Sequence, residues 1–142
     1  MRSRPTLDSR SMADYMVDIF ADAVNTIKTN ERIGRRECVI PSTKFIRAVM
    51  SVMKDSGYIT GFEEFADGKF KKLRVSLSNR INRIGVIKPR FAVTNERISI
   101  YESRYVPSRD FGIVIMSTPK GLMTSREARE RGFGGRMIAY MY

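Results

Sequence analysis

The chain has 142 residues, a formal net charge of +11, no histidine and one cysteine. The lack of histidine excludes an imidazole base and any histidine-containing metal site, and a single cysteine excludes an internal disulfide and a zinc ribbon. The cationic excess, mostly arginine, is typical of proteins that bind a polyanion, because the planar guanidinium group matches phosphate. The alternative interpretation is a basic surface that binds nothing.

No apolar run is long enough to cross a bilayer, and the first ten residues lack the apolar segment of a signal peptide. Together with the lone cysteine, these features favour the cytoplasm and indicate no contact with a membrane. A chain of this length forms one domain or two small lobes that share an interface.

Residues 1–10 are predicted to form a basic, flexible tail. Ser11 is expected to cap a helix that runs to about Lys28 and is followed by a loop at residues 29–34. The apolar stripe of this helix is Met12, Tyr15, Met16, Ile19, Phe20, Ala23, Val24 and Ile27. Its opposite face carries Asp14, Asp18, Asp22 and Asn25.

Residues 36–40 predict a short strand, and Pro41-Ser42 opens a second helix that ends at Gly57. Residues 58–65 and 69–77 predict two strands joined by a turn at Asp67-Gly68. Alternation in the second of these strands places Leu73, Val75 and Leu77 inward. Residues 11–78 are therefore predicted to form an N-terminal lobe with the order α-β-α-β-β.

Residues 79–142 predict a second lobe that is mainly β with a short helix, so the fold class is α+β with two small α/β lobes. A junction at residues 78–90 contains a short strand at 85–87. A β-prone segment at 91–93 precedes a short helix that Asn95 is expected to cap and that ends near Arg104. Residues 111–117 predict a central strand, because they are apolar throughout. Thr124 to Glu127 reads as the capping box of a helix that Gly132 ends, and Gly134-Gly135 leads into a final strand at 136–142.

The loop Ser117-Thr118-Pro119-Lys120-Gly121 is the first candidate site. We expect it to lead from the central strand to the start of a helix, where unpaired backbone N–H groups attract anions. Its hydroxyls, its lysine and its glycine suit phosphate oxygens and ribose hydroxyls. The alternative is an ordinary strand-to-helix loop whose hydroxyls satisfy backbone groups. The spacing differs from that of a nucleotide-binding P-loop.

Arginines after this loop form the second candidate site. Arg126, Arg129 and Arg131 lie on the predicted short helix, and Arg136 follows the Gly-Gly turn. We expect Arg126 and Arg136 to contact phosphates. The alternative is a solvated helix face on which the arginines pair with Glu127 and Glu130, although such pairs are worth only tenths of a kcal/mol.

The junction supplies further cations, namely Arg80, Arg83, Lys88 and Arg90, together with Phe91. An exposed Phe91 is suited to stacking on a base, and the alternative is a core position. Cys38 lies among apolar neighbours in a predicted strand, so it is interpreted as a packed thiol rather than a nucleophile.

Several motifs occur in the order found in one known family. They are Ser117 to Arg129, Gly132-Phe-Gly-Gly-Arg136, Phe20 to Lys28, Ile40 to Lys44, Gly57-Tyr-Ile59, Gly85 to Phe91 and Val106 to Gly112. In these motifs the chain resembles ribosomal protein eight of the small subunit, and the last two resemble the archaeal and eukaryotic branch. The resemblance covers about residues 11–142.

The resemblance implies two α/β lobes and direct, early binding to the central domain of small-subunit rRNA, which the protein helps to fold. It places the main RNA contacts at Ser117, Thr118, Pro119, Lys120 and Gly121. Thr124 also lies in this motif, and Lys44 is expected to meet other RNA segments or a neighbouring protein.

Two positions depart from the family pattern. Pro119 replaces the usual serine and lacks both the hydroxyl and the backbone N–H, so two possible donors to RNA are lost. Arg136 stands where bacterial members often have glutamate, which turns repulsion of phosphate into attraction.

The leading hypothesis is a non-catalytic constituent of the small ribosomal subunit, located in the cytoplasm. Its partners would be 16S-type rRNA and neighbouring ribosomal proteins, with no cofactor, metal or small-molecule substrate. One alternative is a regulator that binds its own messenger RNA. Another is an RNA-processing enzyme that uses Lys120 with Glu127 or Asp110, against which the lack of histidine, metal ligands and a nucleotide loop argues.

Overall fold

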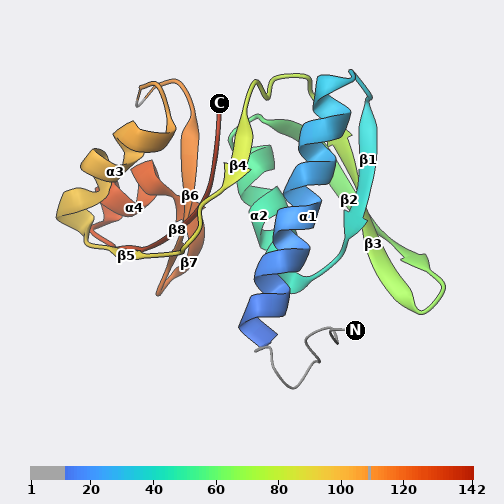
Figure 1. The fold of residues 1–142 in the computed structure, drawn as a ribbon, viewed down its shortest axis with the longest axis horizontal. Helices are drawn as coiled ribbons and strands as arrows, with labels where there is room; N and C mark the ends of the chain where they lie inside the picture. The colour runs from blue at the N-terminus through green and yellow to red at the C-terminus, as the bar shows by residue number, and fades with distance from the viewer. Residues whose placement is uncertain (1–11, 109) are drawn as a thin grey trace, which may run out of the picture.

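The computed structural model describes residues 12–108 and 110–142, and the side chains from residue 19 onward except Arg109. Two antiparallel sheets and two pairs of helices alternate in four layers (Figure 1). Helices α1 (Met12–Arg32) and α2 (Lys44–Asp55) lie between the sheets, and α3 (Ile98–Tyr105) and α4 (Ser125–Arg131) cover the far side of the second sheet. This α+β architecture of two lobes confirms the predicted fold class.

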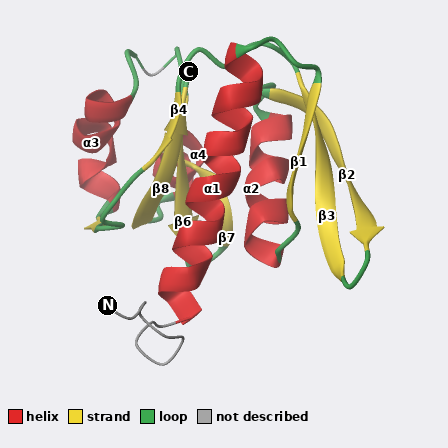
Figure 2. Ribbon diagram, turned by 45° about the vertical axis from the view of Figure 1, so that its right-hand side comes forward, coloured by secondary structure: helices red, strands yellow, loops and turns green. Residues whose placement is uncertain are grey.

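The first sheet has the order β1-β3-β2, and Figure 2 shows it beside α2. Its strands are β1 (Glu37–Pro41), β2 (Ile59–Asp67) and β3 (Phe70–Leu77). Leu73, Val75 and Leu77 of β3 are buried, which confirms the predicted alternation, because one face of the sheet packs on helices while the other meets solvent. The predicted lobe order α-β-α-β-β is therefore correct.

The second sheet has the order β4-β8-β6-β7, with a short additional strand paired to β8. Its strands are β4 (Ile84–Val86), β5 (Ala92–Val93), β6 (Ile113–Thr118), β7 (Gly121–Thr124) and β8 (Gly135–Met141). Strand β6 lies between β8 and β7, as expected for an apolar run that is buried on both faces.

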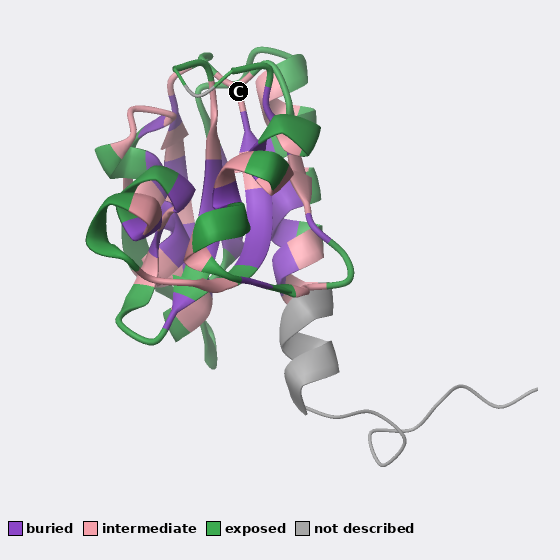
Figure 3. Cartoon of the chain, turned by 90° about the vertical axis from the view of Figure 1, so that its left-hand side faces the viewer, coloured by how far each residue is buried: buried purple, intermediate pink, exposed green. Residues whose placement is uncertain are grey.

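Two apolar cores form on opposite faces of this second sheet. Ile115 of β6 joins the core that contains α1, α2 and the first sheet, whereas Val114 and Met116 join the core under α3 and α4. In Figure 3 the buried residues accordingly concentrate on the strands between the helices. The first core therefore crosses the predicted lobe boundary at residues 78 and 79, because Ile84, Ile115 and Ile138 pack with residues of the N-terminal half.

A bulge in β8 makes this packing possible. Ile115 pairs with Ala139 and Met116 pairs with Met137, so Ile138 is an extra residue in β8. Because the extra residue breaks the alternation, Ile138 and Ala139 both join the first core.

Three predicted boundaries are wrong. Helix α1 continues to Arg32, so most of the loop expected at 29–34 is helical, and Gly34 (φ 78°) ends the turn that follows. The second helix has Thr43 as its N-cap, because the Thr43 hydroxyl accepts from the Ile46 N–H at 3.0 Å. The region after Asn95 begins with a 3₁₀ turn (Asn95–Arg97, η2) before α3. The predicted tail and Ser11 lie outside the described residues.

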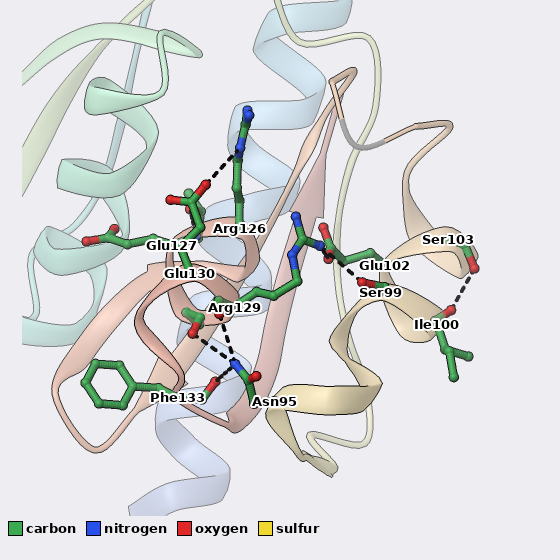
Figure 4. A network of polar contacts seen from close by, with 12 residues as sticks. Asn95, Ser99, Ile100, Glu102, Ser103, Arg126, Glu127, Arg129, Glu130 and Phe133 are labelled. Carbon is green, nitrogen blue, oxygen red and sulfur yellow. Dashed lines mark hydrogen bonds and ion pairs between the residues drawn. The ribbon is translucent and has the colours of Figure 1, made fainter.

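Asn95 caps a different helix from the one predicted. Its side-chain amide donates to the carbonyl oxygens of Ala128 (3.2 Å), Arg129 (3.3 Å) and Phe133 (3.2 Å) at the end of α4. Ala128 and Arg129 also accept from the backbone N–H groups of Phe133 and Gly132, so the amide adds a second donor to the carbonyls of this helix cap. Figure 4 shows this amide beside the end of α4, so Asn95 joins the 3₁₀ turn to α4 across the second core.

No helix among residues 12–142, Arg109 excepted, is long and apolar enough to span a bilayer.

Gly135 is expected to be intolerant of substitution. A Cβ at this position would collide with the backbone carbonyl of Ser117, where β8 begins beside β6. We predict that Gly135→Ala lowers the free energy of unfolding by about 2 kcal/mol or more, because backbone must move to admit the methyl group. Gly61→Ala is the matched control, since Gly61 has open space around it. Urea unfolding of both variants tests this, and equal midpoints would contradict it.

Candidate nucleic-acid interface

The candidate loop is the turn of a β-hairpin rather than the approach to a helix, so the predicted local structure is wrong. Thr118, the last residue of β6, pairs with Gly121, the first residue of β7, and Pro119 and Lys120 form the tip between them. Helix α4 begins four residues later, at Ser125. The expected helix N–H groups are therefore not part of this turn.

The Thr118 hydroxyl is used inside the turn. It accepts a hydrogen bond from the Lys120 N–H at 3.2 Å and donates to the Gly121 carbonyl at 2.8 Å. Only 8% of Thr118 is exposed. Thr118 therefore shapes the turn, and the exposed Ser117, Pro119, Lys120 and Gly121 form its outer surface.

Pro119 fits this turn without strain. It stands at the first tip position, where its fixed φ is compatible with a turn and no ladder hydrogen bond needs its missing N–H. The positive φ required to re-enter the sheet falls on Gly121 (φ 113°), which has open space around its Cα. The departure at Pro119 thus removes two donors but preserves the shape of the hairpin.

Arg136 lies beside the turn, because it pairs with Ser117 across β6 and β8. Its guanidinium group donates to the Arg90 carbonyl at 2.9 Å, and the side chain remains exposed. The close approach at Gly135 brings the start of β8 against this end of β6. Two segments that are far apart in sequence, residues 88–90 and 117–121, therefore meet through Arg136.

Arg90 extends this contact to the N-terminal helices. Its guanidinium carbon lies 5.0 Å from the ring centre of Phe45 and 5.7 Å from that of Phe20. Burial lowers the pKa of Arg90 from its ordinary value. Arg90 is therefore partly a structural cation, while its neighbour Lys88 and Lys44 at the start of α2 are exposed.

We name as the turn surface the exposed residues at this end of the second sheet. They are Ser117, Pro119, Lys120, Gly121 and Arg136. Lys88 and Lys44 lie near this surface, because Lys88 is two residues from Arg90, which contacts Arg136, and Lys44 precedes Phe45, which contacts Arg90.

Other predicted site residues lie elsewhere. Thr124 is the N-cap of α4, and its hydroxyl accepts from the Glu127 N–H at 3.2 Å, which confirms half of the predicted capping box. Arg83 exchanges backbone hydrogen bonds with Tyr142, at the opposite end of β8 from Arg136. Tyr142 lies six residues beyond Arg136, which is about 20 Å at roughly 3.3 Å per residue. The predicted set is thus divided between two ends of the sheet.

Two arginines of α4 form the ion pairs of the alternative interpretation, and their contact with phosphate stays a prediction. Arg126 pairs with Glu130 at 3.6 Å and Arg131 pairs with Glu127 at 3.5 Å, all on an exposed face. Arg126 also lines a recess of about 310 Å³ between the end of α2 and α4. Exposed pairs of this kind contribute less than about 1 kcal/mol, so these arginines can exchange partners.

Arg129 was not predicted to have a structural role. It forms an ion pair with Glu102 of α3, a residue that is only 6% exposed, and it donates to the Ser99 hydroxyl at 3.3 Å. Figure 4 shows this side chain crossing from α4 to α3. Glutamate is mostly exposed in proteins, so its residue type carries no signal for burial, which is why Glu102 was missed.

Phe91 is not the exposed stacking residue that was considered. It is half-buried and packs against Tyr101 with ring centres 4.9 Å apart, within the second core. The alternative interpretation as a core residue is therefore correct.

The catalytic alternative has no geometric basis. Lys120 and Asp110 lie at opposite ends of β6, whose six residues span about 20 Å. Glu127 is engaged with Arg131. In the described part of the chain, no group of three or more carboxylate or thiol residues is placed to hold a metal ion.

Comparison with known proteins defines the class of the chain as that of small ribosomal subunit proteins. The protein called small ribosomal subunit protein uS8 from Thermoplasma volcanium is 47% identical over 126 residues, which is 88% of this chain and 98% of the relative. Those from Picrophilus torridus and Thermoplasma acidophilum are 48% and 45% identical over the same shares of both chains.

Residues 18–142 match the profile of the family described as ribosomal protein S8. The chain belongs to this family, which confirms the resemblance and the expectation that the protein is not an enzyme, and the three relatives named above are archaeal. Proteins of the small ribosomal subunit are cytoplasmic, in agreement with the predicted location.

The Thr118 hydroxyl is predicted to hold the turn. Thr118→Ala should lower stability by about 1–2 kcal/mol, because it removes the partner of two hydrogen bonds, and Thr118→Ser should restore most of that loss. Urea unfolding measures the stability of both variants. Hydrogen exchange at the Lys120 amide measures whether the turn opens when the hydroxyl is removed. If Lys120 exchanges at the same rate in the alanine variant, the hydroxyl does not hold the turn.

Cys38 is predicted to be an inert thiol. Burial, with a smaller contribution from the carboxylates of Glu31 and Glu37, raises the pKa of Cys38 to about 11. Two pKa units above the ordinary value reduce the thiolate fraction at pH 8 by about 100-fold. Alkylation of the folded protein at pH 8 should therefore be slower by at least this factor than alkylation in urea. Equal rates would show that Cys38 is accessible.

Proposed function

We propose that this protein is a structural constituent of the small ribosomal subunit that binds rRNA directly through the turn surface. The observation that carries the proposal is the convergence of Lys120, Arg136 and the exposed Ser117 at one end of the second sheet. The relatives are all called small ribosomal subunit proteins, and this supports the small ribosomal subunit as the assembly in which the protein would bind rRNA.

The chemistry of the turn surface suits folded RNA. Duplex RNA hides its base edges in a deep groove, so recognition relies on backbone shape, 2′-hydroxyls and unpaired bases. Lys120 and Arg136 supply cations for phosphate, and the Ser117 hydroxyl can exchange hydrogen bonds with ribose. The Gly121 backbone is bare of side chain and admits close approach of a sugar.

The rRNA target that we propose is the central domain, which the protein would help to fold. This part of the proposal rests on the family motif carried by Ser117 to Gly121. The rigidity of the hairpin supports it, because a turn already shaped by Thr118 loses little conformational freedom when it binds. Neighbouring small-subunit proteins are the other proposed partners.

Lys120→Gln should weaken binding to a central-domain rRNA fragment and reduce the slope of log K against log salt by about one. Lys69→Gln is the matched control, because Lys69 is also an exposed lysine near the tip of a hairpin, the one between β2 and β3. Filter binding at several salt concentrations gives both slopes.

Two outcomes would contradict the proposal. Equal affinity of the wild-type protein for the rRNA fragment and for unrelated duplex RNA at moderate salt would remove the specific target. Equal effects of the two substitutions would show that bulk charge, and not the turn surface, determines the affinity.

A further inference from the structure

We infer that the protein has a second RNA-binding surface at the end of the molecule opposite the turn surface. It consists of Arg32, Arg35, Arg36, Arg80 and Arg83, which we name the arginine patch. The inference deepens the proposed function, because it gives an RNA-binding protein a second surface that holds a separate RNA segment.

Hydrogen bonds bring together the two loops that carry these arginines. The Glu31 carboxylate, at the end of α1, accepts from the Asn79 N–H at 2.9 Å and from the Ile81 N–H at 3.2 Å. The Leu77 N–H donates to the Arg36 carbonyl at 2.8 Å. The loop after α1 and the loop after β3 therefore form one surface, and Arg83 extends it to the end of β8.

Among the described residues, the cations of the patch outnumber the carboxylates beside them. All five arginines are exposed, and none forms an ion pair with another residue in the described part of the chain. The carboxylates beside the patch are those of Glu31, which accepts from backbone N–H groups, and Glu37, which lies 3.9 Å from Arg74, so five arginines face two carboxylates. A concentration of like charge without partners disfavours the free protein and favours a bound polyanion.

RNA is the ligand that the patch fits best. All of its cations are arginines, whose planar forks bind phosphate oxygens in pairs, and they come from the end of α1 and two loops rather than from one helix face. Arg35 and Arg36 also line a recess of about 550 Å³ between α1 and β1, which Thr26 and Asn30 border. Glu37, Cys38 and Val39 complete the lining, so the phosphate contacts that we propose fall on the exposed arginines at its rim and not on its interior.

Two independent lengths separate the patch from the turn surface. Along α1, Arg32 lies twelve residues beyond Phe20, which is near Arg90, and this is about 18 Å at roughly 1.5 Å per residue. Along β8, the distance from Arg136 to Tyr142 is about 20 Å at roughly 3.3 Å per residue, and Tyr142 bonds Arg83. In Figure 1, α1 runs from the lower to the upper part of the molecule in agreement with this separation. One RNA duplex bound at the turn surface therefore leaves the patch free for a second.

A capture experiment with the full chain tests the inference. A central-domain rRNA fragment is immobilised and saturated with protein, and a fluorescent RNA duplex of unrelated sequence is then added at moderate salt. We expect the wild-type protein to retain the duplex. The triple variant R32Q/R35Q/R36Q should bind the immobilised fragment as before but retain the duplex about tenfold to a hundredfold less, because about three phosphate contacts are lost.

The matched control is K69Q/K71Q/K72Q, which removes the same charge from the β2–β3 hairpin. Exposed ion pairs of Lys71 and Lys72 contribute little to stability, and urea unfolding of both variants verifies that each is folded. Retention of the duplex by the control and its loss from the patch variant would support the inference. Equal retention by the patch variant and the wild type, or an equal loss in both variants, would overturn it.

Two further measurements separate this inference from related ideas. If a polyglutamate peptide of matched charge displaces the duplex as efficiently as competitor RNA does, the patch is a docking surface for acidic protein and the inference is wrong. If the wild-type protein shows no preference for the rRNA fragment, the proposed function fails. Duplex binding by the free protein, compared between wild type and R32Q/R35Q/R36Q, still reports on the patch in that case.

Discussion

The burial of both faces of strands β6 and β8 is the constraint on which the structure depends. Ile115 and Ile138 face the core with α1 and α2, whereas Val114, Met116 and Met137 face the core with α3 and α4. Each fully buried side chain of this size contributes about 1.5–3 kcal/mol, so the two cores outweigh any single polar contact in the molecule. The two lobes are consequently joined by shared packing and not only by the connecting chain.

This packing determines which cations are structural and which are free. Arg90 lies over Phe45 beside the first core, and Arg129 lies against Glu102 beside the second. A cation over an aromatic ring is worth about 0.5–2 kcal/mol, and removal of one partner from a buried ion pair costs several kcal/mol, so these arginines are held in place. Lys120 and the arginine patch lie outside both cores and remain available to phosphate.

Most elements could be predicted from the sequence because they carry local signals. Alternation along residues 73–77 and the Thr124 and Gly132 signals around α4 correspond to what the structure has. The hairpin at Ser117 to Gly121 was missed because four residues of β7 form a strand only by pairing with β6, which no local pattern reveals. Asn95 was assigned to the wrong helix for the same reason, since its partners lie more than thirty residues away.

The candidate site was predictable in its residue types but not in its arrangement. A cationic, hydroxyl-rich segment near the end of the chain indicated phosphate binding, and the family motif placed it at Ser117 to Gly121. The internal hydrogen bonds of Thr118 and the separation of Arg83 from Arg136 depend on strand pairing across the whole second sheet. The arginine patch joins residues 32–36 to residues 80–83 through Glu31, a long-range contact with no signature in composition.

The position of β8 in the second sheet also bears on biosynthesis. This strand follows all the other described elements in chain order, yet it pairs with β4, β5 and β6 and contributes to both cores. During translation, the second sheet and both apolar cores therefore stay incomplete until residues 135–141 have been synthesised and can pair with β4, β5 and β6. Apolar surface that these residues cover in the folded protein is exposed in a shorter nascent chain, and transiently exposed surface of this kind favours aggregation.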